Sequence, residues 1–111
     1  MKAKQVLLTG GSRGLGPFIA EALARQGANI ALAARSENDL NLIASRIRNL
    51  GVQCLAIAVD LERANGRKRL VELVLEKFGV IDVLVNGAGV DARAFARTFH
   101  GRLCVRCSRS T

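Results

Sequence analysis

A glycine-rich turn between an apolar run and a helical pattern constrains this chain more than any other feature of its sequence. The run Gln5–Leu8 is followed by the turn Thr9–Gly16 (TGGSRGLG), and a helical pattern comes next. Glycines in such a turn allow a tight reversal, bring backbone N–H groups close to a pyrophosphate, and let the helix pack close to the strand. The start of the helix adds free N–H groups and a positive dipole end. The first sixteen residues therefore predict a strand–turn–helix unit that binds a dinucleotide.

The segment after the turn has the pattern of an amphipathic helix. Pro17 lies in its expected first turn, where a missing N–H costs little. Gly27 stands where a left-handed C-cap glycine is common. Apolar residues recur between them at intervals of three and four positions. The stripe that we expect to face the core consists of Leu15, Phe18, Ile19, Ala22 and Leu23.

Short apolar runs recur as far as Gly89, and helical patterns separate them. The runs hardly alternate with polar residues, as is typical of strands buried on both faces of a parallel sheet. Strands separated by helices indicate βαβ units with right-handed crossovers. The chain therefore predicts an α/β fold, the N-terminal half of a doubly wound Rossmann fold, with a parallel sheet of about four strands in the order 3-2-1-4 and three helices. The later strands are expected at Asn29–Ala34, Gln53–Val59 and Ile81–Val85.

The second and third helices have different start signals. Ser36 is a suitable N-cap for a helix from Glu37, with Asp39 as the capping-box acid and Leu40, Ile43, Ala44 and Ile47 on its core face. Gly51 follows as its stop. The third helix covers about Glu62–Phe78, and Asn65–Gly66 weakens its start. Its inward residues are expected to be Leu70, Val71, Val74, Leu75 and Phe78.

The sequence changes character after residue 90. The net charge of the chain is +8, and residues 91–111 contribute five arginines and only one acidic residue to it. This segment has neither capping residues nor a sustained apolar period. We therefore expect a nucleotide-binding half-domain over residues 1–90 and a basic, irregular tail over residues 91–111. One hypothesis is that the reading frame is interrupted near residues 88–94, so that the tail is translated out of frame.

Four motifs, in order along the chain, resemble those of the short-chain dehydrogenase/reductase family. The turn Thr9–Gly16 matches the family pattern T-G-x-x-x-G-x-G. Ala34–Ser36, Asp60–Leu61 and Asn86–Gly89 are similar to the landmarks that follow the next three strands, although the second residue of the last motif is Gly where the family commonly has Asn. The resemblance covers residues 4–90 and implies an NAD(P)-dependent oxidoreductase.

The resemblance also implies which residues contact the cofactor. Asp60 is similar to the acid that contacts the adenine, and a second role as N-cap of the third helix remains open. Asn86 is similar to the asparagine near the adenosine ribose, and Ala88 leaves backbone room. The full expected set is Gly10, Ser12, Arg13, Gly14, Leu15, Gly16, Arg35, Ser36, Asp60, Leu61, Asn86, Ala88 and Gly89.

The residues at the end of the second strand favour NADP over NAD. Proteins that prefer NAD commonly have an acidic residue there, which binds the ribose 2′-hydroxyl. This chain has Arg35 instead, and its next acidic residue is Glu37. Arg13 is expected at the same corner of the site. Two guanidinium groups favour a 2′-phosphate through charge-assisted hydrogen bonds. The alternative is that both arginines are only solvated.

The catalytic residues that the resemblance implies are absent. The family uses a Tyr as general acid, a Lys four residues later that lowers its pKa, a Ser and an upstream Asn. The chain has no Tyr, no Lys after Lys77 and no Asn after Asn86. We therefore assign no catalytic residue and expect a fragment that binds NAD(P) but does not transfer hydride alone. The alternative is a nucleotide-binding or regulatory partner of a full-length reductase.

Other chemistries find little support in the sequence. Cys104–Cys107 with His100 offers too few ligands for zinc, so no metal is expected. Cys54 is expected in the core, and an odd total of three cysteines does not suit a disulfide framework. The tail arginines have only Phe95 and Phe99 interleaved for base stacking, which does not favour nucleic acid.

Location and partners follow from the same patterns. No apolar run is long enough to cross a membrane and no signal-peptide layout is present, so we expect a cytoplasmic protein. In a four-stranded sheet, Val83–Val85 would form an exposed edge. An apolar edge strand invites pairing with another chain. We therefore expect marginal stability and either self-association or association with a full-length relative through the fourth strand.

Overall fold

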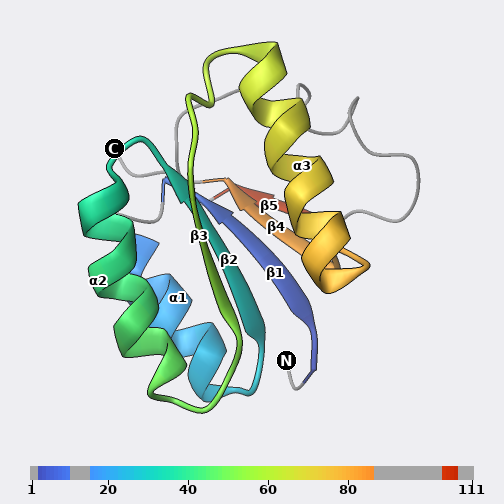
Figure 1. The fold of residues 1–111 in the computed structure, drawn as a ribbon. Helices are drawn as coiled ribbons and strands as arrows, with labels where there is room; N and C mark the ends of the chain where they lie inside the picture. The colour runs from blue at the N-terminus through green and yellow to red at the C-terminus, as the bar shows by residue number, and fades with distance from the viewer. Residues whose placement is uncertain (1–2, 11–15, 87–103, 108–111) are drawn as a thin grey trace.

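A parallel sheet with helices on both faces forms the fold (Figure 1). The computed structural model describes residues 3–10, 16–86 and 104–107. The elements are, in chain order, β1 (Gln5–Thr9), α1 (Gly16–Arg25), β2 (Asn29–Ala34), α2 (Glu37–Arg48), β3 (Cys54–Ala58), α3 (Ala64–Phe78), β4 (Val83–Asn86) and β5 (Cys104–Cys107).

The strand order is β3-β2-β1-β4-β5, and all neighbouring strands are parallel. The expected order 3-2-1-4 of a doubly wound sheet is thereby confirmed. Val6 pairs with Ile30 of β2 on one side and with Val83 of β4 on the other, so β1 lies in the middle of the sheet. At the amino ends, the backbone N–H of Gln5 donates to Asp82 Oδ2 at 2.7 Å, and the N–H of Asp82 donates to the Gln5 carbonyl at 2.8 Å.

The fifth strand departs from the expected fold. Residues 104–107 belong to the segment predicted to be irregular, yet they pair with β4 in parallel register from Val83↔Cys104 to Asn86↔Cys107. Four residues carry too little pattern to predict a strand, whereas the outer edge of β4 offers backbone groups that need partners. The expectation that β4 is an exposed edge is therefore wrong: in the described part of the chain, the edges are β3 and β5. The other residues of the predicted tail lie outside the described ranges.

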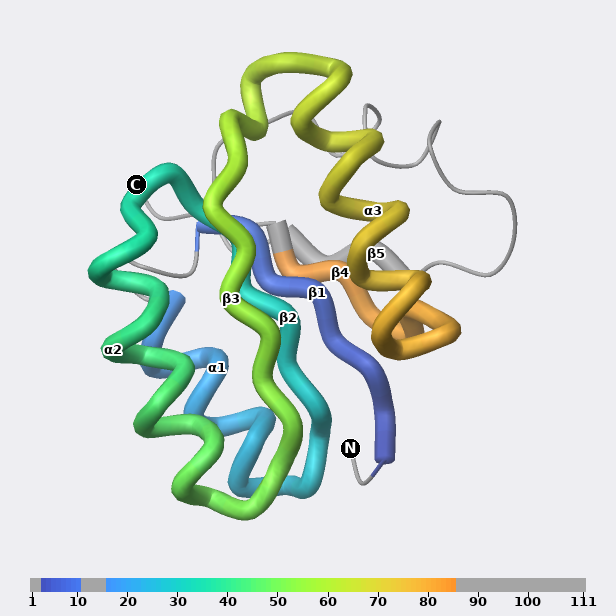
Figure 2. The backbone as a smooth tube through the Cα atoms, viewed as in Figure 1, coloured from blue at the N-terminus to red at the C-terminus, as the bar shows by residue number. Residues whose placement is uncertain are grey.

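Alternate side chains of the central strand, β1, pack into two separate hydrophobic cores on the two faces of the sheet. Val6 and Leu8 belong to the core under α1 and α2, whereas Leu7 belongs to the core under α3. Figure 2 shows α1 and α2 together on one side of the sheet and α3 on the other. This division follows from right-handed crossovers, because the chain moves in one direction from β1 to β3 and then returns across the sheet to β4.

Helix α2 forms as its sequence predicts. Ser36 is its N-cap, and the hydroxyl Oγ accepts a hydrogen bond from the backbone N–H of Asp39 at 3.5 Å. At the other end, Arg48 donates from Nε and Nη2 to the Cys54 carbonyl at 3.1 and 2.8 Å, which ties the helix to the start of β3. The expected core face is confirmed, since the buried residues are Leu40, Ile43, Ala44 and Ile47.

Helix α1 is rotated relative to the expected stripe. Its buried residues are the small ones, Gly16, Ala20 and Ala24, with Ile19 and Leu23 packed beside them. Phe18 is 69% exposed and Ala22 is also exposed, so both were wrongly predicted to face the core. Small side chains let the helix backbone approach the sheet closely, and this contact outweighs the burial of one large ring. Leu15 lies outside the described residues.

Helix α3 begins at Ala64, later than predicted, and buries a narrow stripe. Leu70, Val71 and Val74 are buried, and Phe78 packs against them. The prediction for Leu75 is wrong, because this side chain is 39% exposed. Within the described residues α3 covers its face of the sheet alone, so a side chain on its flank has no neighbouring helix to pack against.

The prediction that Cys54 lies in the core is confirmed, since its side chain is buried. Burial raises the pKa of its thiol from 9.0 to about 11, against a smaller lowering by Arg48. In the unfolded chain the thiol ionises near its ordinary pKa, so the protonated thiol favours the folded state fully below about pH 9. That contribution is lost as the pH rises toward the folded value.

We therefore expect the free energy of unfolding to fall by about 2 kcal/mol more in the wild type than in Cys54→Ala between pH 9 and 11. Urea unfolding in the Cys104→Ser/Cys107→Ser background measures this difference without interference from the other thiols. Equal losses in the two proteins would show that the thiol has no such effect. A disulfide-exchange reagent at pH 8 provides a second measure, because Cys54 should react only as fast as the fold opens.

Candidate functional site

The candidate residues come together at the carboxyl ends of the strands. Gly10 directly follows β1, Arg35 directly follows β2, Asp60 is the second residue after β3, and Asn86 ends β4. Because all four strands run parallel, these ends lie at one edge of the sheet. The direction of winding reverses between β1 and β4, and open α/β sheets bind ligands outside the carboxyl ends at such a point.

At the end of β1, Thr9 and Gly10 are held by hydrogen bonds to the two neighbouring strands. Thr9 is buried and its hydroxyl donates to the Val85 carbonyl of β4 at 3.5 Å. Gly10 has a φ of 73°, a conformation that favours glycine, and its N–H donates to the Ala33 carbonyl of β2 at 2.8 Å. The predicted site residues Ser12, Arg13, Gly14 and Leu15 lie outside the described residues.

Helix α1, which begins at Gly16, is the next described element after Gly10, and its start lies at the same edge of the sheet. Its first residue, Gly16, is buried. The first turn contains no acidic side chain. The positive end of the helix dipole therefore meets no carboxylate from its own helix, and this arrangement fits the phosphate of a dinucleotide.

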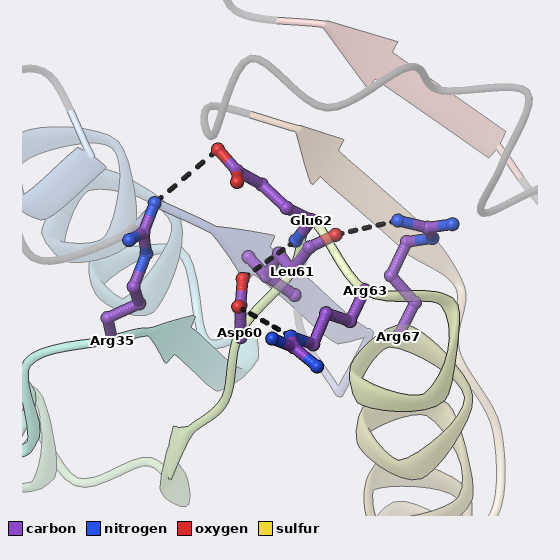
Figure 3. Close-up of polar contacts among 6 residues, drawn as sticks. All are labelled: Arg35, Asp60, Leu61, Glu62, Arg63 and Arg67. Atoms are coloured by element: carbon purple, nitrogen blue, oxygen red, sulfur yellow. Dashed lines mark hydrogen bonds and ion pairs between the residues drawn. The ribbon is translucent and has the colours of Figure 1, made fainter.

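Arg35 projects from the end of β2 (Figure 3). Its Nη2 lies 3.4 Å from Oε1 of Glu62, and the two side chains are 72% and 74% exposed. The next residue, Ser36, uses its hydroxyl as the cap of α2. Of these two expected cofactor residues, Arg35 is therefore the one whose side chain reaches into solvent at the site edge.

Asp60 organises the loop between β3 and α3. Its Oδ1 accepts a hydrogen bond from the backbone N–H of Glu62 at 3.1 Å, and its Oδ2 lies 3.4 Å from Nε of Arg63. The N-cap of α3 is Arg63, without a side-chain cap bond, so the alternative role of Asp60 as N-cap is wrong. Asp60 caps the turn before the helix because the helix begins later than the sequence pattern predicted.

Leu61 anchors the same loop through its side chain and its carbonyl. The side chain is buried in the core under α3. The carbonyl accepts a hydrogen bond from Nη1 of Arg67 at 2.8 Å, and Figure 3 shows Arg67 reaching back from α3 to this loop. The loop beside the site is thus held by the packing of the Leu61 side chain in the core and by the hydrogen bond from Arg67 of α3.

Gly66 lies against the Asp60 backbone. A Cβ atom at this position would lie 2.1 Å from the Asp60 carbonyl oxygen and 3.1 Å from its carbonyl carbon. Such distances are far inside van der Waals contact, and the atoms met are backbone. The glycine that weakens the helix in the sequence therefore lets α3 begin directly beside the candidate site.

The end of β4 contributes backbone pairing to the site edge. Asn86 pairs with Thr9 of β1 and with Cys107 of β5. The predicted site residues Ala88 and Gly89 lie outside the described residues.

Glu62 is a functional candidate that the sequence pattern did not indicate. It stands two residues after Asp60, in a loop with no regular period. The predicted adjacency of the second and third strands was the available signal, since it places the loops after both strands side by side.

The described residues were compared with the patterns of a metal site and of a membrane-spanning helix. They hold no group of three or more His, Cys, Asp or Glu side chains arranged to bind a metal ion. Among their helices, none combines the length and the hydropathy that crossing a bilayer requires.

The sequence matches the family profile of the short chain dehydrogenases over residues 4–103, which extends past the four motifs. Ketoacyl reductase HetN of Nostoc sp. is 37% identical over 91 residues, which are 82% of this chain and 32% of that protein. A solved actinorhodin polyketide ketoreductase variant with NADPH is 32% identical with a TM-score of 0.75, over 81% of this chain and 36% of the other. A solved NADH-dependent reductase complexed with NAD is 34% identical with a TM-score of 0.73, over 80% and 37%.

These similarities cover most of this chain but only about a third of each relative. The solved neighbours include one complex with NADPH and one with NAD. The shared fold is therefore compatible with either nucleotide, and the choice between them depends on individual side chains.

Proposed function

Because the chain belongs to the short-chain dehydrogenase family, we propose that it binds a nicotinamide dinucleotide at the carboxyl edge of the sheet and prefers NADP(H) to NAD(H). The exposed guanidinium of Arg35 at the end of β2 carries this proposal. An acidic residue in this position would favour the ribose 2′-hydroxyl of NAD. An arginine favours the 2′-phosphate of NADP through charge-assisted hydrogen bonds.

In this proposal, different site residues bind different parts of the cofactor. The turn from Gly10 to Gly16 and the start of α1 hold the pyrophosphate through backbone N–H groups. Arg35 and Arg13 bind the 2′-phosphate, and Asp60 contacts the adenine. When bound, the cofactor supplies or accepts the hydride. The full set remains Gly10, Ser12, Arg13, Gly14, Leu15, Gly16, Arg35, Ser36, Asp60, Leu61, Asn86, Ala88 and Gly89.

The chain acts in this proposal as the nucleotide-binding part of an oxidoreductase. Its 111 residues contain no Tyr to serve as the general acid that the family uses, so these residues do not transfer hydride by themselves. The cytoplasm stays the proposed location, on the sequence argument alone.

A second candidate function is association with a full-length relative as a nucleotide-binding or regulatory partner. The sheet favours it, because β3 and β5 are the outer strands of the described residues. An outer strand offers unpaired backbone groups to another chain. Co-purification with a full-length reductase would distinguish this role from that of an isolated nucleotide-binding fragment.

Titration of the purified chain with NADPH and with NADH tests the proposed function. We expect both to bind, with a Kd for NADPH about tenfold lower, which corresponds to one good charge-assisted contact to the 2′-phosphate. An NADPH-oxidation assay with a panel of carbonyl compounds should give no rate above the blank. Turnover by the pure chain would overturn the statement about hydride transfer. Salt-sensitive RNA binding without any nucleotide binding would overturn the proposal as a whole.

A further inference from the structure

An acidic side chain from the neighbouring loop reaches the arginine at the end of β2. Nη2 of Arg35 and Oε1 of Glu62 are 3.4 Å apart. The backbone explains the approach, since the N–H of Val59 donates to the Ala34 carbonyl at 2.9 Å and the two chains leave the sheet side by side. The bond from the Glu62 N–H to Asp60 Oδ1 then fixes the direction in which Glu62 leaves the turn (Figure 3).

This ion pair contributes little to the stability of the fold. Both side chains are more than two thirds exposed. Exposed pairs of this kind typically contribute less than about 1 kcal/mol, because water and salt screen the charges and two long side chains lose freedom. Either side chain can therefore turn toward a ligand at small cost. We expect the pair to affect the affinity for ligands more than the stability of the fold.

A carboxylate beside Arg35 has opposite effects on the two possible ribose substituents. It competes with a 2′-phosphate for the guanidinium, and it repels the phosphate charge at the same time. A 2′-hydroxyl, in contrast, is a hydrogen-bond donor that a carboxylate accepts readily. Glu62 therefore offers the hydroxyl the partner that NAD-preferring proteins commonly provide from the second strand.

We propose that Glu62 is a specificity-determining residue that limits the preference of this site for a 2′-phosphorylated nucleotide. The acid that the end of β2 lacks is supplied by the loop after β3. Arg35 favours the phosphate and Glu62 favours the hydroxyl, so the site discriminates less than Arg35 alone would. This inference rests on the proposed function, because it concerns the same nucleotide site.

Adenosine 2′,5′-bisphosphate and adenosine 5′-monophosphate are suitable probes, because they differ only in the 2′-phosphate. Their dissociation constants are measured by calorimetry at low salt for the wild type, Glu62→Gln and Glu76→Gln. Glu76 is a matched control: it is exposed and lies in the last turn of α3, at the opposite end of the helix from the site. Both substitutions change the net charge equally.

We expect Glu62→Gln to lower the Kd of the bisphosphate by about threefold to tenfold and to leave that of the monophosphate unchanged or slightly raised. Glu76→Gln should change neither by more than about twofold, and salt should reduce the Glu62 effect. Equal changes for both probes, or the same change in both variants, would overturn the role of Glu62 while leaving nucleotide binding intact. Failure of the wild type to bind NADPH, NADH or either probe would overturn the proposed function instead.

Discussion

Replacing Gly66 with alanine is expected to destabilise the fold by about 1 to 3 kcal/mol, which is the usual cost of forcing an extra group into a packed site. The sign is the informative part. Alanine is the better helix former by about 1 kcal/mol, so an ordinary exposed glycine in a helix gains stability from this change. Here the new Cβ would lie 2.1 Å from the Asp60 carbonyl oxygen, and backbone cannot move aside as a flexible side chain would.

Urea denaturation of the wild type, Gly66→Ala and Asn65→Ala measures this effect. Asn65 is exposed in the same turn of α3 and is the matched control, with an expected small gain in stability. A Gly66→Ala protein as stable as the wild type would contradict the close approach. Because the displaced atoms belong to Asp60, we also expect weaker nucleotide binding in Gly66→Ala than in Asn65→Ala.

Replacing Arg35 with alanine is expected to weaken NADPH binding by about tenfold, which is the lower end of the range for hydrogen bonds to charged groups. The affinity for NADH should change by no more than about twofold, since NADH carries a hydroxyl where NADPH carries the phosphate. The site would then bind the two nucleotides about equally. Titration of each variant with both nucleotides gives the ratio directly.

Arg46 provides the control for Arg35. It is also an exposed arginine in an ion pair, with Nη2 3.3 Å from Oε1 of Glu21, but it lies in the last turn of α2, away from the carboxyl edge. Arg46→Ala should leave the ratio of the two affinities unchanged. A parallel loss of NADPH and NADH binding in Arg35→Ala would indicate a general effect on the site and would contradict the assignment of the 2′-phosphate to Arg35.

The strand order was predictable from the sequence because the signals were long-range and redundant. Apolar runs separated by helical patterns leave few ways to build a sheet, and right-handed crossovers select among them. Helix α2 was equally accessible, since Ser36, Asp39 and a regular core face all indicate the same element. Local preference and tertiary packing agree there.

The wrong predictions share a different cause. Whether each of these residues is buried or paired depends on how another element packs against it or leaves it exposed. Phe18 is the largest residue of its stripe, yet α1 packs through Gly16 and Ala20. Leu75 has the right spacing, but α3 has no described neighbour on its flank. Cys104–Cys107 forms a strand because β4 offers an edge, and its own residues carry no such signal.

The residues of the candidate site also fall into those that the sequence predicts and those that only the folded structure reveals. Gly10, Arg35 and Asp60 could be predicted because each follows a strand that the sequence indicates. Glu62 could not, since its position depends on the turn that Asp60 caps and on the neighbouring loop after β2. Side chains that act through a partner from another element are visible only when both elements are placed.

The central position of β1 has a consequence for the order in which the protein is assembled during synthesis. The strand at the middle of the sheet, β1, is synthesised before the other described strands, yet one of its two neighbours is β4. The bond from the Gln5 N–H to Asp82 joins residues that are 77 positions apart. Contacts over such distances form slowly, because a long loop must close before they are gained. Until β4 is synthesised, the edge of β1 that pairs with β4 in the folded sheet has no partner strand there, so the sheet can be completed only after residues 83–86 are available.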